Sequence, residues 1–376
     1  MLHWENILSR PKAYFINGGA GRVICSIPAF EELEKTNEDF IIVCEGGMDF
    51  YKGHPTLHKK SYDHWHKGLF EQHIKHRDIV SPEPYRVWEY YNQKCSLSQA
   101  FDLEINKKGI RELPPPTVVL NKIEIAQAFN VVQEVKAKTG FDKVLVVQPF
   151  GRGVQNMGEM VIDPSSRSIN LANLVEIINE LKKEYAIIMM SEFPIPLEEN
   201  DSGKYPVAMP SIGDVRVWAG IIQIADHFLG VDSVGQHLAY AFEKTGTIVI
   251  GSTYPINTTY PNYKGFDVFD MGKETRVYEP IRISMEDEVQ RANDEIMEMN
   301  KFQLQDIISS VRKRLGKSTK FKGKFVPPPE NNGCCTPTDP VQTLNTDVPV
   351  QPNLISEPKF AISNNSLTPL SQKEKL

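Results

Sequence analysis

The chain has 376 residues, of which 40% are hydrophobic and 24% are charged, and its formal net charge is −6. This length suits two domains rather than one core, and the composition is typical of a soluble globular protein. No run of about 18 apolar residues reads as a membrane-spanning helix, and the overall acidity argues against a protein that coats nucleic acid.

Cysteine usage and the N-terminus indicate the compartment. The five cysteines show neither metal-ligand spacing nor a disulfide framework, which suits a reducing environment. The first residues, MLHWENILSRPKAYF, lack the long apolar core of a signal peptide. We therefore expect a cytoplasmic protein.

The first predicted elements form a βαβ unit. Residues 13–17 (AYFIN) are a compact apolar run, the glycine turn GGAGRV follows, and apolar periodicity over 24–33 predicts a helix. The run FIIVCE at 40–45 predicts a second buried strand, parallel to the first. Residues 51–112 are aromatic and histidine-rich without a clear period, and we expect short helices and long loops there.

A second alternating series follows the prolyl stretch LPPPT at 113–117, which marks the approach to a boundary. Its predicted helices and strands alternate, as in a parallel α/β sheet. In chain order they are a helix at 121–138, a strand at 144–149, a helix at 170–183, a strand at 185–190, a helix at 214–224, a strand at 227–231, a helix at 233–243, a strand at 247–251 and a closing helix at 285–315.

These patterns predict an α/β protein with two parallel-sheet domains and a tail. The first domain spans 1–138, and the second, with its closing helix, spans 139–325. Residues 326–376 are rich in Pro, Asn, Ser and Thr, so they bury too little apolar surface to offset their ordering entropy. We expect this tail to be disordered.

Two strand-to-helix turns carry residues suited to binding a ligand. The first turn consists of Gly18, Gly19, Ala20, Gly21 and Arg22. Glycines here permit a tight turn and let a ligand approach the amides at the helix N-terminus. The third glycine of the G-x-G-x-x-G motif is absent at the required spacing, so a plain tight turn and a ligand-facing loop both remain open.

The second turn lies in GVDSVGQHLAYAF, where a strand leads into a helix. Asp232 or Ser233 can cap this helix with a side-chain oxygen. The amides of residues 233–235 and the helix dipole, equivalent to roughly half a positive charge, would attract a phosphate. His237 lies one turn along the helix and faces the turn. The alternative is a capped helix whose histidine bonds its own strand end.

Two further segments, one rich in histidine and one rich in lysine and arginine, each allow more than one role. Six histidines fall between residues 54 and 76 with spacings that give only pairs of metal ligands, so a zinc site, a surface that recognises a ligand and solvated side chains are the alternatives. Residues 309–326 hold seven basic side chains and no acid, which suits a solvated helix end or contact with an anionic membrane or nucleic acid.

The two turns resemble motifs of the lipopolysaccharide heptosyltransferase family, family 9 of the glycosyltransferases. INGGAGRVICSIPAFEEL resembles the family's opening strand, glycine loop and helix. ADHFLGVDSVGQHLAYAFEKTGTIVIGSTYP resembles its A-D-x-x-I-G-x-D-[ST]-G-x-x-H-L-A-A-A motif with the following strand and G-x-T-x-P. The spacing from Asp232 to His237 is kept. The resemblance implies GT-B architecture, in which two Rossmann-like domains face each other.

The resemblance also implies a reaction. A sugar would pass from a nucleotide-diphosphate sugar on the second domain to an acceptor on the first, with inversion and without a metal or cofactor. The implied donor-phosphate residues are Asp232, Ser233, Val234, Gly235, His237, Arg152 and Arg167, and Glu192 stands where the family places a group near the donor ribose. The acceptor is left open between a glycan, a lipid-linked molecule and a nucleic acid. We expect a monomer, and 309–326 is the segment that would make any peripheral contact with an anionic surface.

Two positions depart from the family pattern. Arg22 stands where the family has the aspartate proposed as the base, and an arginine is too basic to take a proton. Val234 stands where the family has glycine, and Gly235 follows one position later. Asp49 or one of the histidines would have to replace the base, and His237 is a second candidate catalytic residue. The sequence therefore leaves three functions open: an active glycosyltransferase, a sugar-nucleotide epimerase on the same fold, or a nucleotide-sugar-binding protein without catalysis.

Overall fold

The computed structural model describes residues 10–151, 153–156, 161–191, 193–197, 206–277, 293 and 295–323. The expected tail at 326–376 lies outside these residues, and so do residues 285–292 and 294 of the expected closing helix. Residues 295–300 are not helical, so this helix begins later than its sequence predicts, at Lys301 after the N-cap residue Asn300. The described residues form two sheets of parallel strands, as the sequence predicts. In addition, β6 (Gln155–Asn156) and β7 (Val161–Ile162) pair as a small antiparallel ribbon.

The first sheet has the strand order β3-β2-β1-β4. Its strands are β1 (Lys12–Ile16), β2 (Phe40–Cys44), β3 (Ser61–Asp63) and β4 (Asp78–Val80). β1 pairs in parallel with β2, with Lys12 opposite Phe40, which confirms the predicted βαβ unit. The other edge of β1 pairs with β4, so the strand order reverses between β1 and β4.

Helices cover one face of this sheet. Successive side chains of a strand point to opposite faces, so alternate residues of β1 show which face this is. Tyr14 and Ile16 of β1 belong to the main hydrophobic core, together with α1 (Ala20–Glu34) and α3 (Leu97–Asn106). Ala13 points to the other face, where a smaller apolar cluster forms. The first turn of α1 therefore sits at the carboxyl end of β1, on the covered face.

Residues 51–112 contain more regular structure than their sequence predicts. The expected short helices are present as η1 (Met48–Tyr51), η2 (Leu57–Lys60), the π-helical turn η3 (Phe70–Ile74), η4 (Pro84–Arg86) and α2 (Trp88–Tyr91). Strands β3 and β4 correct the expectation of long loops. Each has only three residues, and neither is buried along its length, so neither produces an apolar run.

The second sheet has the strand order β11-β10-β9-β5-β8, and its strands are parallel. They are β5 (Val144–Gln148), β8 (Ala186–Met189), β9 (His227–Val231), β10 (Gly246–Ile250) and β11 (Phe266–Asp270). All but β11 match the apolar runs of the sequence. β5 pairs with β8 on one edge and with β9 on the other, so the order reverses between β5 and β9.

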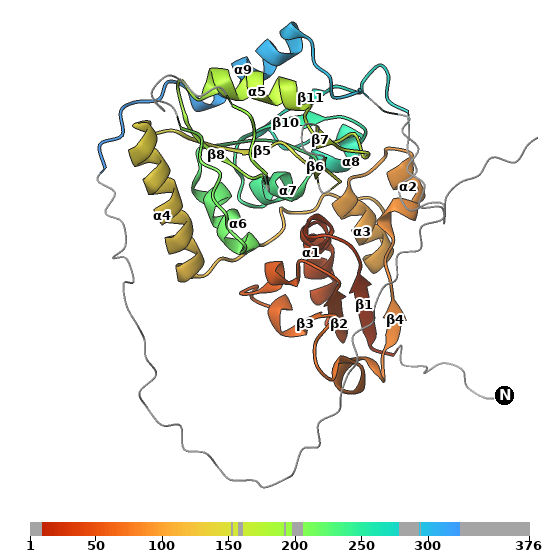
Figure 1. Cartoon of the computed structure of the whole chain (residues 1–376). Coiled ribbons are helices and arrows are strands. Elements are labelled where there is room, and N and C mark those ends of the chain that lie inside the picture. The colour runs from red at the N-terminus through yellow and green to blue at the C-terminus, as the bar shows by residue number, and fades with distance from the viewer. Residues whose placement is uncertain are drawn as a thin grey trace, which may run out of the picture. The chain divides into compact units, whose positions relative to one another are not determined.

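Helices lie on both faces of the second sheet (Figure 1). Leu145 and Val147 of β5 share a core with α5 (Leu171–Leu181) and α9 (Lys301–Leu315). The alternate residues of β5 belong to the main core on the opposite face. The helices of that face are α4 (Lys122–Thr139), α6 (Val215–Ile224) and α7 (Val234–Ala241), and the short α8 (Pro255–Thr258) follows β10.

Helix α4 packs against α6 and β8 of the second sheet. The approach to α6 is close, because a side chain at Gly220 would meet Ala128 of α4 at 2.8 Å. These contacts group α4 with the second sheet, whereas the sequence placed residues 121–138 at the end of the first domain. A boundary at residue 138 would therefore divide α4 from α6 and β8, the elements on which it packs.

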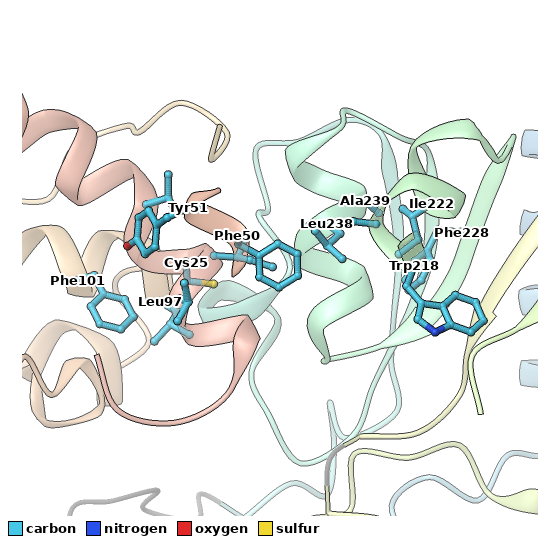
Figure 2. Close-up of a cluster of buried hydrophobic side chains, with 14 of the residues drawn as sticks. Cys25, Phe50, Tyr51, Leu97, Phe101, Trp218, Ile222, Phe228, Leu238 and Ala239 are labelled. Carbon is cyan, nitrogen blue, oxygen red and sulfur yellow. The ribbon is translucent and has the colours of Figure 1, made fainter. Parts of the chain in front are cut away.

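One hydrophobic core extends from the first sheet to the second. Figure 2 shows Cys25 and Phe50 from the first-sheet elements on one side and Leu238 and Ala239 of α7 on the other. Helix α1 also packs directly against α7. Because each of these helices starts at a candidate ligand-binding turn, their contact brings the two turns together.

The described part of the basic segment 309–326 divides into paired and exposed side chains. Arg312 donates to Glu184, and Arg314 donates to Asp267, so both arginines are paired with acids of the protein. The exposed basic side chains are those of Lys313, Lys317, Lys320 and Lys322. Within the described ranges, no helix is both long and apolar enough to cross a bilayer.

Candidate functional site

The candidate site lies where the strand order of each sheet reverses. Ligands of parallel α/β sheets bind outside the carboxyl ends of the strands at this position. In the second sheet it falls between β5 and β9, which end at Gln148 and Val231. In the first sheet it falls between β1 and β4, which end at Ile16 and Val80.

The turn after β9 differs in detail from the phosphate turn predicted by the sequence. Ser233 is the N-cap residue of α7, but no side chain caps the helix, so the expected cap by Asp232 or Ser233 is absent. The amide of Gly235 donates to Oε1 of Gln148 at 2.8 Å. Of the three amides expected to face a phosphate, that of Gly235 is therefore already bonded, which leaves those of Ser233 and Val234.

His237 is buried where α1 meets α7. Its Nδ1 lies 2.8 Å from the Tyr260 hydroxyl and 3.5 Å from Sγ of Cys25, so the ring bonds across the junction rather than to its own strand end. A side chain at Gly21 would come within 3.2 Å of the His237 ring. Burial alone would lower the pKa of His237, but Cys25 and the Asp232 carboxylate outweigh it and raise the pKa.

Asp232 links this histidine to a cation. Its Oδ1 lies 4.0 Å from Nε2 of His237, and its Oδ2 lies 3.9 Å from Nη1 of Arg167. Arg167 keeps 27% of its side chain exposed, whereas Asp232 is only 10% exposed. Of the two charged groups, Arg167 is therefore the one that a ligand can reach.

The loop that carries Arg167 is held by one partly buried carboxylate. Asp163 accepts hydrogen bonds from the amides of Ser165 and Ser168 and from both of their hydroxyls. Burial opposes ionisation, but these bonds outweigh it and lower the pKa of Asp163. Ser252, after β10, donates to the carbonyl oxygen of Ser165. The loop is thereby fixed at the carboxyl edge of the second sheet.

The glycine loop after β1 is held by an acidic side chain. The amide of Gly18 donates to Oε2 of Glu45 at 2.6 Å, and Gly18 has a φ of 100°, which favours glycine. Gly19 is the N-cap residue of α1. A side chain at Gly47 would meet Cα of Ala20 at 2.7 Å, so the following loop packs closely on this turn.

Arg22 turns away from solvent into the first-sheet half. Its Nη1 donates to Glu83 at 3.0 Å, and its Nη2 donates to the carbonyl oxygen of Pro82 at 3.3 Å. The guanidinium carbon also lies 5.0 Å from the ring centre of Tyr85 and 5.6 Å from that of Phe101. Arg22 therefore bridges the start of α1 to the chain that follows β4.

Of the other predicted site residues, Asp49 is paired with a neighbouring lysine, and two lie outside the described residues. Asp49 belongs to η1, and its carboxylate forms an ion pair with Lys52. Arg152 and Glu192 lie outside the described residues.

The histidines of 54–76 take several different roles. His54 is buried and bonds Glu31, so it supports the fold. The ring of His73 lies tilted against that of Tyr62 with centroids 4.2 Å apart, and His66 packs edge-on against the same ring. In the part of the chain that the structure describes, no three His, Cys, Asp or Glu side chains gather as a metal site.

Several residues of the cluster were missed by sequence reasoning. Cys25, Tyr260 and Glu83 are far from the turns in sequence or in the middle of a helix, and no motif marks them. Tyr260 stacks on Tyr240 of α7 with ring centroids 3.6 Å apart. Gln148 carries the one usable signal, because it is a polar residue at the end of an apolar strand.

Comparison with known proteins identifies the fold. No family model matches the chain, and no curated protein matches its sequence. The glycosyl transferase family 9 structure from Veillonella parvula is similar, with 12% identity and a TM-score of 0.56 over 81% of this chain and 97% of that one. ADP-heptose lps heptosyltransferase II from E. coli has 11% identity and a TM-score of 0.53, over 80% of this chain and 99% of that one.

A third similar structure is the iron-containing dodecameric glycosyltransferase TibC from enterotoxigenic E. coli. It has 10% identity and a TM-score of 0.51, over 81% of this chain and 76% of that one. The predicted α/β fold of GT-B type is thus confirmed, and the resemblance to glycosyltransferase family 9 is confirmed at the level of the fold. None of these findings supports the expected monomer, which stays a prediction.

Proposed function

We propose that this protein transfers a glycosyl group from a nucleotide-diphosphate sugar to an acceptor hydroxyl. One observation carries the proposal: α1 packs on α7 so closely that a side chain at Gly21 would come within 3.2 Å of the His237 ring, which brings the reversal points of the two sheets together beside the accessible cation Arg167. Similar structures that are named as glycosyltransferases support the same reaction.

The donor diphosphate is assigned to the second sheet. Arg167 supplies a charge-assisted hydrogen bond, and the amides of Ser233 and Val234 carry the positive end of the α7 dipole. Asp232 holds Arg167 in place through their 3.9 Å contact. His237 lies behind Asp232 and is 5% exposed, so it positions Asp232 rather than touching the donor.

The reaction is a single displacement that inverts the anomeric carbon. The acceptor oxygen attacks this carbon, and the bond from carbon to the diphosphate oxygen breaks with its electron pair on the diphosphate. Arg167 and the helix dipole stabilise the charge that develops there, which is electrostatic catalysis without a metal.

The test is a panel of ADP-, UDP- and GDP-sugars, with release of the nucleotide diphosphate as the readout. We expect release from one class of donor, faster with a suitable glycan, lipid-linked or nucleic-acid acceptor, and unchanged by EDTA. Loss of activity in EDTA would contradict the metal-independent route. No release from any donor, with every acceptor class, would contradict glycosyl transfer.

Donor binding is tested at Arg167. Replacing Arg167→Ala removes a hydrogen bond to a charged group, worth about 1.5–3 kcal/mol, so the dissociation constant for the donor should rise about 10- to 100-fold. Isothermal titration calorimetry measures this constant. Arg312→Ala is the matched control, since Arg312 bonds Glu184 on α9's side of the sheet. Equal donor affinity in both variants would contradict the placement.

A second candidate function is nucleotide-sugar binding without turnover. One observation favours it: Arg22, at the position of the family's proposed base, is buried in an ion pair with Glu83. Donor binding in calorimetry, with no release of nucleotide diphosphate under any condition, would support this function over transfer.

Two properties of the assembly follow as proposals. The exposed lysines Lys313, Lys317, Lys320 and Lys322 support contact with an anionic acceptor or membrane surface, which added salt should weaken. A monomer is expected in solution, and light scattering after size exclusion measures the mass.

A further inference from the structure

We propose that Glu83 is the carboxylate that takes the proton of the acceptor hydroxyl, in the role that Arg22 is unable to fill. This inference rests on the proposed glycosyl transfer. It adds to that proposal the identity of a catalytic residue, which is on a different segment of the chain from the glycine loop.

Glu83 lies at the reversal point of the first sheet. It follows β4, which ends at Val80 and pairs with β1, whose own end leads into the glycine loop. Side chains that follow two neighbouring parallel strands meet at the same edge, where ligands bind. Glu83 keeps 23% of its side chain exposed, against 6% for Arg22. The carboxylate is therefore accessible, whereas the guanidinium is enclosed.

Arg22 orients this carboxylate. Its two terminal nitrogens bond Oε1 of Glu83 and the carbonyl oxygen of Pro82, and Tyr85 and Phe101 enclose the guanidinium. A buried, doubly bonded arginine fixes its partner in one geometry. Arg22 therefore places a cation in the first turn of α1, where the family has an aspartate. The carboxylate comes instead from Glu83, on the segment after β4.

A short series of contacts connects Glu83 with the donor side. Arg22, its partner, adjoins Gly21, where an added side chain would lie 3.2 Å from the His237 ring. His237 lies 4.0 Å from Asp232, and that carboxylate lies 3.9 Å from Arg167. Tyr85, two residues after Glu83, is partly buried, and its ring centre lies 5.0 Å from the guanidinium carbon of Arg22. Glu83 and the proposed diphosphate site therefore belong to one electrostatic cluster.

The other carboxylates near the glycine loop fit the role less well. Glu45 follows β2, away from the reversal point, and its Oε2 accepts the Gly18 amide. Asp49 also lies beyond β2 and pairs with Lys52. Asp232 is enclosed between Arg167 and His237.

The proposed step conserves atoms and charge. As the acceptor oxygen bonds to the anomeric carbon, its proton passes to the Glu83 carboxylate, and the nucleotide diphosphate leaves with the electron pair of the broken bond. Water is the simplest hydroxyl that the site can use, so slow hydrolysis of the donor depends on the same base.

The test measures hydrolysis of the donor that the wild-type chain uses from a panel of ADP-, UDP- and GDP-sugars. General-base catalysis contributes about 10²- to 10⁴-fold, so Glu83→Gln should lower the turnover number by about that factor. The donor dissociation constant should change less than about twofold, because the base contacts the acceptor. Glu83→Asp should restore at least part of the rate, and Glu71→Gln, an exposed pair with Lys75, should leave it unchanged.

Thermal melting of each variant separates catalysis from folding. A slow Glu83→Gln variant that melts with the wild type and binds the donor supports the proposal. Wild-type turnover in Glu83→Gln overturns it, and so does a loss of turnover in Asp49→Asn instead. Glu83→Asp as slow as Glu83→Gln, with a lowered melting temperature in both, also overturns it in favour of a structural ion pair. A wild-type chain that hydrolyses no donor overturns glycosyl transfer itself, and this inference with it.

Discussion

The displaced glycine in the turn after β9 has a local explanation. Gln148, at the end of β5, places its side-chain oxygen on the amide of Gly235. A side chain at Gly235 would collide with this oxygen and meet Cε2 of Phe228 at 2.8 Å. Val234 is partly exposed at the start of α7 and is free of this restriction. The glycine stands where an added side chain would collide with two neighbours, one residue after its place in the family pattern.

The close approach predicts a cost for any larger residue. Gly235→Ala forces a methyl group against Gln148 and Phe228, and overpacking of this kind costs about 1–3 kcal/mol. The free energy of unfolding from urea titrations should fall by that amount. Gly109→Ala is the control, since a side chain there would meet nothing within 4 Å. Similar stabilities for the two variants would show that the turn relaxes without strain.

At the scale of elements, the sequence predicts those whose apolar pattern is complete. β2 and β9 are buried at every residue, and the apolar or small runs FIIVC in β2 and FLGV in β9 reveal them. β11 is buried only at Phe266, and the acids of FDVFD hide it. β3 and β4 are found only through their pairing with the first sheet.

The same limit applies to the site. Turns at the ends of apolar strands can be predicted because their residues are adjacent in the chain. Glu83 and Arg22 are bonded although they lie 61 residues apart in the sequence, and Tyr260 and Cys25 are 235 residues apart. Such partners are set by the packing of helices and sheet edges, and the local sequence carries no sign of them. Arg22 stands where the similar family has an acid, and a buried arginine needs an acidic partner. Its position in the sequence does not indicate that this partner is Glu83.

Helix α6 carries a buried arginine, Arg216, that bonds to three other segments of the chain. Arg216 donates to both oxygens of Glu124 on α4, at 2.6 and 2.8 Å. It also donates to the carbonyl oxygens of Asp49 and Val119. Burial opposes ionisation of the carboxyl, but Arg216 and the N-terminal backbone of α4 outweigh it and lower the pKa of Glu124.

Removing this arginine should destabilise the whole chain. Arg216→Ala leaves a buried carboxylate and two carbonyl oxygens without their donor, which costs about 3–5 kcal/mol. Chemical denaturation should show this loss. Arg77→Ala breaks an ion pair with Asp39, whose side chain is 62% exposed, and should cost no more than about 1 kcal/mol. Equal losses would mean that Arg216 contributes no more than a surface ion pair.

Stability of the whole molecule depends on two buried histidines that respond to pH in opposite senses. Burial lowers the pKa of His227 to about 3, and its nitrogens lie beside the hydroxyls of Thr245 and Thr247. The pKa of His237 is raised, so its contribution is complete below the unfolded value of 6.5 and is lost as pH rises through its folded pKa. Of these two histidines, only His227 therefore makes stability depend on pH well below 6.5.

The sign for His227 follows from proton binding. Below its unfolded pKa of 6.5 the unfolded chain binds a proton that the folded chain excludes until about pH 3, so acid favours unfolding. The free energy of unfolding should fall by about 1.4 kcal/mol for each pH unit well below 6.5. Denaturant titrations from about pH 7 down to about pH 4.5 measure this slope before most carboxylates titrate. His227→Gln stays neutral and should remove the slope, whereas the exposed His58→Gln should keep it. If His227→Gln keeps the wild-type slope, another group carries the acid sensitivity of this fold.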